Sequence, residues 1–352
     1  MASTSYGVNH DLAVKLWSKK LFQEALKATY FSKFMGKGTG NIVQIKDETS
    51  KSAGDKITVG LRMQLSGDGV QGDGTLEGNE EALSTYADAV YIDQLRHAVR
   101  SAGKMSEQRV PFSVREEAKD GLRDWWQDRL DTWFFNQLAG NTLSTLGTKY
   151  TGNQAALAPS SGKQIWADGT TDETLTSAGV FNLNLIDKCV EKAKTASPLI
   201  RPVKVGGKDK FVMFLHPYQV YDLRTTTSDG QWLDIQKAAM SGGDVSKNAI
   251  YDGSLGEYNG VILHESTRIP GGVNSTTSAA VASTRRAVFC GAQAAVMAYG
   301  KDDSGEMSWV EELFDYGNQL GVSAGMIAGL KKTRFNSADF GTIVVSTYAA
   351  AH

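Results

Sequence analysis

The segment Pro111–Gly140, PFSVREEAKDGLRDWWQDRLDTWFFNQLAG, predicts one long helix over residues 113–139. Ser113 is suited to cap its N-terminus, and Glu116 three residues later completes a capping box. Gly140 stands where a left-handed C-terminal stop is favoured. At ~1.5 Å per residue the helix spans roughly 40 Å, which is long for a globular protein and enough to cross a whole domain.

Apolar side chains recur along this helix at intervals of three and four residues, so they share one face. We expect the large aromatic members of this stripe to form the core beneath the helix: Trp125, Trp126, Trp133 and Phe134. The opposite face is charged, and we expect its carboxylates, Asp131 among them, to be solvated. A tryptophan stripe predicts architecture and carries no chemistry by itself.

The composition limits the class of protein. A chain of 352 residues is long enough for two or three packed units. Its net charge of −2 provides no basic field that would draw nucleic acid to its surface. Cys189 and Cys290 lie far apart in apolar settings, which indicates reduced thiols and synthesis in a cytosol. No apolar run approaches the ~20 residues of a membrane span.

Residues 41–105 predict an extended β-hairpin. Apolar and polar residues alternate strictly from Lys56 to Leu65, which is the pattern of a half-buried strand. A second extended run, roughly residues 83–99, returns toward the long helix. Between the two runs lies a glycine-rich acidic tip, with Asp68, Asp73 and Glu77 as candidate assembly residues. A hairpin of this kind is poorly stable alone, so we expect it to lie on another surface, such as a second copy of the chain.

Residues 1–40 predict an N-terminal arm. Leu12, Leu16 and Phe22 keep helical spacing and are candidate assembly residues on an apolar stripe. The arm either covers a neighbouring surface or forms the first core helix, and its terminal position favours the neighbour.

The second half of the chain predicts a mixed α/β unit. Residues 141–178 are rich in small polar residues, and we interpret them as a surface insertion. Residues 181–197 predict a helix that Pro198 ends. Later apolar runs predict strands, at residues 210–217, 260–265, within 284–300 and at 341–348. Glycines at 321, 325 and 329 indicate close packing inside a sheet or helix.

No catalytic or metal-binding pattern is found. The histidines lack metal spacing, and His264-Glu265 is not followed by the second histidine of a zinc helix. The acidic tip misses the spacing of a calcium loop. Neither cysteine lies beside a basic cluster that would activate it. The sequence predicts no cofactor, no metal and no enzymatic activity.

The order of these elements resembles the HK97-fold major capsid proteins of tailed bacteriophages, an α+β fold. The stretch SEQRVPFSVREEAKDGLRDWWQDRLDTWFFNQLAG, residues 106–140, is similar to the N4 gp56-type major capsid family. The runs FVMFLHPYQVYDLR, GVILHESTRIP and AVFCGAQAAVMAYG resemble the family's axial domain and the return to its peripheral domain.

This resemblance implies a set of domains. They are an N-terminal arm at 1–40, an extended hairpin (the E-loop) at 41–105, a peripheral domain at 106–199 with the spine helix at 113–139, an axial domain at 200–286, and a return to the peripheral domain at 287–352. The resemblance also implies that the E-loop lies over an adjacent subunit.

The implied function is that of a major capsid protein, made in the bacterial cytoplasm and found in the virion. The chain would assemble with itself into pentamers and hexamers of an icosahedral shell. That shell would enclose double-stranded DNA without sequence-specific binding, contact portal and scaffolding or decoration proteins, and involve no membrane. Two alternatives remain open: the shell of an encapsulin-like nanocompartment, or a tail-associated binding protein or enzyme. Co-purified cargo would distinguish the first alternative, and activity of a monomer the second.

Overall fold

The spine helix has the ends that its sequence predicts. In this computed structural model, α3 covers Val114–Ala139, and the Ser113 hydroxyl accepts the amide of Glu116 at its N-terminus. Gly140 adopts the left-handed conformation with φ 63° and ends the helix. The structure describes residues 29–46, 54–63, 65–109, 113–146, 151–152, 154–205, 207–225, 255–300 and 308–351.

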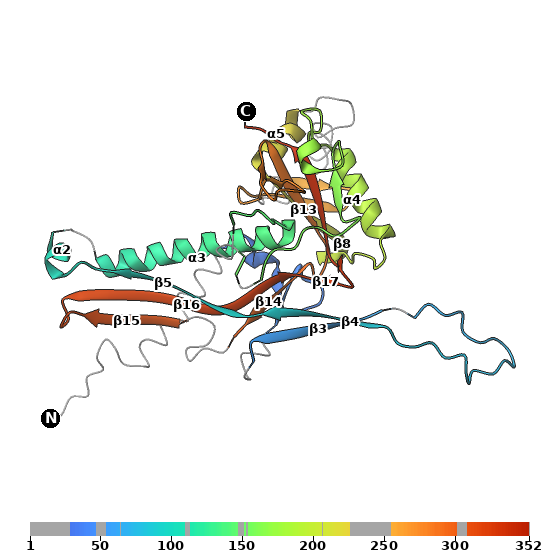
Figure 1. Cartoon of the computed structure of the whole chain (residues 1–352), viewed down its shortest axis with the longest axis horizontal. Coiled ribbons are helices and arrows are strands. Elements are labelled where there is room, and N and C mark those ends of the chain that lie inside the picture. The colour runs from blue at the N-terminus through green and yellow to red at the C-terminus, as the bar shows by residue number, and fades with distance from the viewer. Residues whose placement is uncertain are drawn as a thin grey trace.

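A six-stranded sheet lies along the spine helix and forms the first unit with it (Figure 1). Its central strand β16 is antiparallel to β5, β14 and β15, while β2 is parallel to both β14 and β1. The strands of this sheet are β1 (Met35–Gly36), β2 (Val43–Lys46), β5 (Asp93–Arg100), β14 (Ala295–Tyr299), β15 (Ser308–Phe314) and β16 (Gln319–Lys332). The short helix α2 (Lys104–Gln108) follows β5.

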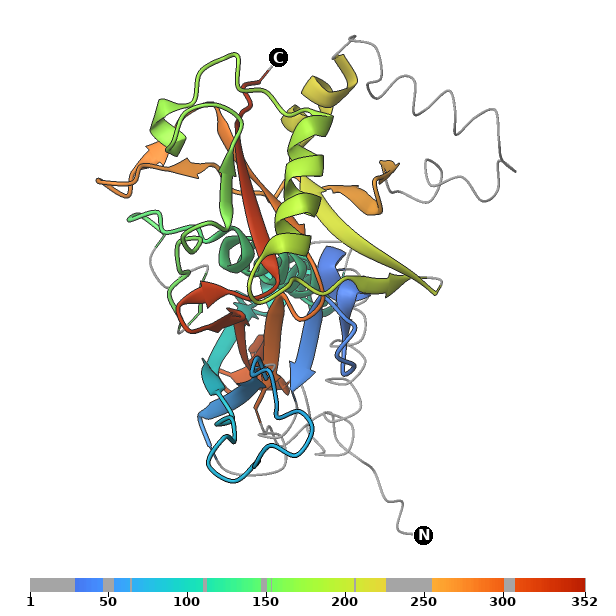
Figure 2. The same ribbon diagram turned by 90° about the vertical axis from the view of Figure 1, so that its right-hand side faces the viewer.

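A seven-stranded sheet forms the second unit, with helix α4 (Leu183–Thr195) against one face (Figure 2). The strand order is β6-β19-β13-β8-β10-β9, and β7 also pairs with β8. These strands are β6 (Gln164–Trp166), β7 (Val203–Val205), β8 (Lys208–Leu215), β9 (Gly256–Tyr258), β10 (Val261–Glu265), β13 (Thr284–Cys290) and β19 (Thr342–Tyr348). Helix α5 (Pro217–Thr225) follows β8.

The remaining elements are short. Three two-stranded ribbons are β3–β4 (Lys56–Arg62 with Thr85–Tyr91), β11–β12 (Gly272–Val273 with Ala280–Val281) and β17–β18 (Arg334–Phe335 with Ala338–Asp339). Two 3-10 turns are η1 (Tyr30–Phe34) and η4 (Asp172–Thr174).

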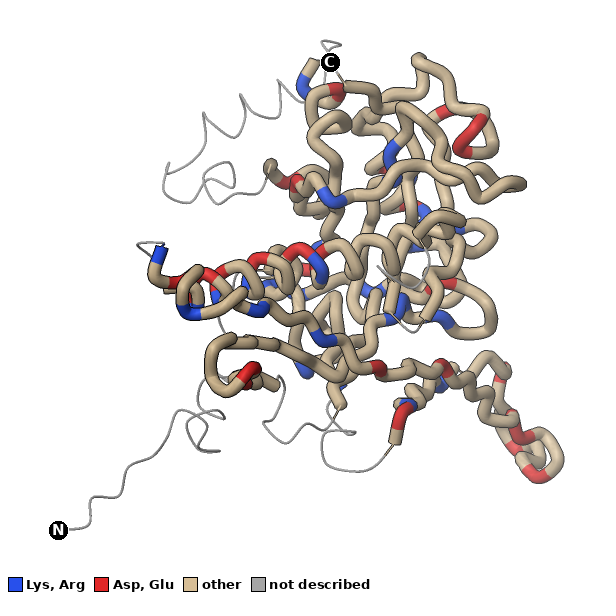
Figure 3. Tube along the Cα trace, turned by 60° about the vertical axis from the view of Figure 1, so that its left-hand side comes forward, with Lys and Arg blue, Asp and Glu red and all other residues tan. Residues whose placement is uncertain are grey.

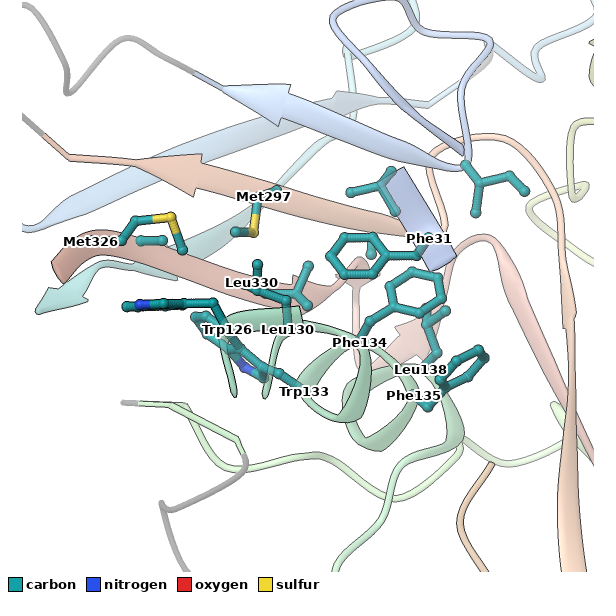
Figure 4. Close-up of a cluster of buried hydrophobic side chains, with 14 of the residues drawn as sticks. Phe31, Trp126, Leu130, Trp133, Phe134, Phe135, Leu138, Met297, Met326 and Leu330 are labelled. Atoms are coloured by element: carbon teal, nitrogen blue, oxygen red, sulfur yellow. The ribbon is translucent and has the colours of Figure 1, made fainter. Parts of the chain in front are cut away.

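The main core lies between the spine helix and the six-stranded sheet. Trp126 and Phe134 are completely buried there, and Trp133 is nearly so. Phe31 of η1 stacks on Phe134 with ring centres 4.6 Å apart (Figure 4). Trp125 is only half-buried and stacks on the exposed His97. The helix therefore stabilises the unit mainly through the burial of large aromatic side chains.

The structure changes three expected boundaries. The unit predicted at 200–286 also contains β6, β19 and α4. Strands β6 and β19 pair within its sheet, and the apolar face of α4 packs against that sheet. The C-terminal strand β19 therefore joins this unit and not the six-stranded sheet that contains β14, β15 and β16. The two-stranded hairpin covers only β3 and β4, since β2 and β5 of the predicted range 41–105 belong to the six-stranded sheet.

The segment 141–178, expected to be a surface insertion, contributes a strand and buried residues to the seven-stranded sheet unit. Strand β6 within it pairs in parallel with β19, and Asp172 is buried. The small polar residues of this segment predict an exposed loop. Part of the segment is nevertheless buried, because its polar groups bond to backbone groups and to distant polar side chains. Helix α4 ends at Thr195, shortly before Pro198, as its sequence predicts.

Candidate assembly interfaces

The β3–β4 hairpin is anchored at its strands, where Ile57 and Val90 pack against Val296 and Ala298, and is exposed at its tip. Its strands pair from Lys56 opposite Tyr91 to Arg62 opposite Thr85, and its tip extends far from the rest of the molecule (Figure 1). The described residues from Leu65 to Thr85 are all exposed. A tip with no packing partner among the described residues is available to a partner outside the chain.

The tip is acidic, and one of its carboxylates, that of Glu81, accepts hydrogen bonds from backbone amides of the opposite side of the loop. Residues 63–84 contain five acidic residues and no lysine or arginine, and Figure 3 shows the loop end with acidic positions only. The candidate residues Asp68, Asp73 and Glu77 all lie there and are exposed. The carboxylate of Glu81 accepts the amides of Ser66 at 2.8 Å and Gly67 at 2.7 Å. These two backbone hydrogen bonds, that of Ser66 foremost, lower the pKa of Glu81.

The root of the hairpin is held by charge and by close backbone contact. The carboxylate of Asp88 pairs with Lys331 and accepts the amide of Arg334 at 2.9 Å. Gly329 of β16 faces Tyr91, and a Cβ atom at Gly329 would lie 2.1 Å from the Tyr91 carbonyl oxygen. The hairpin therefore leaves the body at a fixed position.

Residues 29–46 attach to the spine helix through a buried carboxylate. Asp131 is fully buried and accepts the amides of Tyr30 at 3.1 Å and Phe31 at 3.4 Å. Arg268 lies 3.5 Å from the same carboxylate and 2.9 Å from Asp128. The expectation that Asp131 is solvated is wrong, because the start of η1 needs an acceptor for its unpaired amides. The arm candidates Leu12, Leu16 and Phe22 lie outside the described residues.

A second buried pair joins the spine helix to the seven-stranded sheet. Arg286 of β13 pairs with Asp172 at 2.8 Å and donates to the carbonyl of Gly140 at 2.8 Å. The carboxylate of Asp172 also accepts hydrogen bonds from the Trp166 indole and the Val273 amide. The pairing of Asp172 with Arg286 could not be predicted from the sequence, since no local pattern links the two positions.

The described residues hold no arrangement that indicates catalysis. They include no group of three or more metal-ligating side chains. Both cysteines are buried, and burial raises the pKa of the Cys189 thiol to about 12. The pKa values of His216 and His264 are lowered to about 4, in each case first by burial and then by a nearby cation. Among the described residues, no helix is both long and apolar enough to span a membrane.

The whole chain matches one protein family. The family model, described as phage capsid protein, matches residues 5–351. This chain belongs to the phage capsid protein family.

Individual relatives cover almost the full chain. The major capsid protein of Pseudomonas phage KPP25 is 28% identical, over 96% of this chain and 94% of its own length. The capsid of Ralstonia phage GP4 is 33% identical with a TM-score of 0.78, over 99% of both chains. The cyanophage Pam1 capsid shares the fold with a TM-score of 0.75 at 22% identity, covering 100% of this chain and 95% of its own.

These likenesses establish the fold and the role. The α+β architecture, with few helices and many strands, is the HK97-like capsid fold. The chain is a phage major capsid protein. Its expected relation to phage capsids is thereby confirmed at the level of the family.

Proposed function

We propose that this capsid protein assembles with itself, as pentamers and hexamers, into the closed icosahedral shell of a phage head. The hairpin supports this proposal, because residues 65–85 of its tip are exposed and pack against no other part of the described chain. An element that is poorly stable alone is explained if it lies on a second copy. In this proposal the β3–β4 hairpin is the E-loop, and residues 1–40 tie neighbouring subunits together.

The shell would enclose double-stranded DNA without binding it tightly. The net charge of −2 supports this, because a strongly basic protein would hold the DNA by its phosphates. Portal and scaffolding or decoration proteins would be its other partners. We place the protein in the virion, after synthesis in the host cytoplasm, and assign it a structural role without enzymatic activity. Residues 106–140 support a closer relation to the N4 gp56-type capsid proteins.

Deletion of residues 66–79 tests the proposal. The deletion removes most of the tip and leaves both hairpin strands and the Asp88 contacts, so we expect a folded, soluble subunit that assembles poorly. Analytical ultracentrifugation measures the assembled fraction, and a denaturant titration confirms that the subunit keeps its stability. Normal assembly of the deleted protein would show that the tip makes no contact between subunits.

A further inference from the structure

A groove of about 450 Å³ lies beside η1, where residues 33–42 face strands β7, β8 and β10. Its charged lining consists of Lys33 and Lys204, and the described residues that line it include no carboxylate. Phe34, Val205 and Ile262 supply apolar surface. The groove is therefore basic and apolar, which suits a partner that is acidic and apolar.

Two polar groups in the groove are poorly satisfied by the described chain. The Nδ1 atom of His264 is buried and has no hydrogen-bond partner among the described residues. The ammonium of Lys33 lies 4.4 Å from the centre of the Tyr30 ring. Burial lowers the pKa of Lys33. Among the described residues, the groove therefore presents a buried nitrogen that lacks a hydrogen-bond partner and a cation that is partly desolvated.

The hairpin tip has the complementary chemistry. Residues 63–84 contain five carboxylates and no lysine or arginine. The side chains of Leu65, Leu76 and Leu83 are each more than half exposed. We propose that the groove of one subunit receives the hairpin tip of an adjacent subunit, its lysines facing the tip carboxylates and its apolar wall covering the tip leucines. This inference rests on the proposed function, since it needs subunits side by side.

The tip must come from a second copy. Figure 1 shows the hairpin extended away from the body, so that the tip does not reach the groove of its own chain. Residues 1–28 are a poorer match, because they carry four lysines and only two acidic residues. A larger groove is lined by Lys194 and Arg201 but also by Asp209, whose carboxylate would repel the tip and makes this groove a poorer receptor.

Disulfide trapping in co-assembled subunits tests the contact. One chain carries Gln71→Cys at the exposed tip, and the other carries Val205→Cys at the groove. The native Cys189 and Cys290 are completely buried, so the new thiols react selectively. In the matched control, the second chain carries Lys188→Cys, at an exposed position on α4, in place of the cysteine at position 205. After mild oxidation, we expect covalent dimers on a non-reducing gel from the groove pair and none from the control pair.

A charge exchange provides an independent measurement. Lys204→Glu should raise the protein concentration needed for assembly, and Asp73→Lys on the same chain should restore assembly in part, whereas Lys188→Glu should have no effect. Shells that form without dimers at position 205, or with equal dimers at position 188, would overturn the groove assignment and leave the shell function intact. Failure of the unsubstituted protein to form shells would instead contradict the proposed function.

Discussion

The carboxylate of Asp131 accepts the backbone amide of Tyr30 at 3.1 Å, across 101 residues of sequence. Together with the amide of Phe31 at 3.4 Å, this contact fixes the start of η1 on the spine helix. It also orients Phe31 so that its ring stacks on Phe134. One buried acid thus fixes the position of η1 on the spine helix.

Asp131→Ala should destabilise the subunit by about 2 kcal/mol, because two buried amides lose a charged acceptor. The desolvation cost of the carboxylate offsets part of the loss. Asp128→Ala is the matched control: Asp128 also bonds Arg268 but is largely exposed, so its removal should cost less than about 1 kcal/mol. Urea unfolding of unassembled subunits measures both, and equal losses would contradict the anchoring role of Asp131.

Gly329→Ala should destabilise the root of the hairpin by roughly 1–3 kcal/mol, because the new methyl group meets the Tyr91 carbonyl oxygen at 2.1 Å and backbone must move. Gly60→Ala is the control, since Gly60 lies in β3 and its Cβ would meet nothing within 4 Å. Hydrogen exchange of the β4 amides locates the effect. Unchanged exchange in Gly329→Ala would show that the close approach has no structural role.

Arg286→Ala should cost about 3–5 kcal/mol, because it leaves the buried Asp172 without its cation and the carbonyl of Gly140 without a donor. Arg123→Ala should change stability by less than about 1 kcal/mol, since the carboxylates beside Arg123 are exposed. Thermal unfolding compares the two variants. A loss no greater for Arg286→Ala than for Arg123→Ala would contradict the role of Arg286 as the junction between helix and sheet.

Stability should fall as the pH drops from 6.5 to 4. Burial first, and then repulsion from Lys33, lowers the pKa of His264 to about 4, so in this window the unfolded chain binds more protons than the folded chain. The gap from the ordinary value of 6.5 corresponds to about 3 kcal/mol. His216 acts in the same direction. His264→Phe should therefore flatten the dependence in part, and an unchanged slope in urea titrations would refute the assignment.

The sequence predicts those parts of the fold whose signals are local. Ser113 and Gly140 mark the ends of the spine helix through contacts within one turn, and the alternation after Lys56 marks β3. The candidate acids Asp68, Asp73 and Glu77 lie together at the tip for the same reason, since one short loop contains them.

Features that depend on distant partners were not predictable. The position of Asp131 on the charged face of the helix predicts a surface residue, and its burial depends on the distant Tyr30. The segment around Asp172 looks like a polar loop, because its burial depends on Arg286, 114 residues later. The place of β19 in the seven-stranded sheet likewise depends on β13 and not on the sequence of β19 itself. The groove at Lys33 and Lys204 arises only when two remote segments meet.

Negative-stain electron microscopy of the purified protein, together with its sedimentation profile, tests the central claim most directly. We expect closed icosahedral shells, or pentameric and hexameric rings, in the fast-sedimenting fraction. A monomer or dimer under every condition of salt and scaffold, with no shell or ring on the grid, would contradict it.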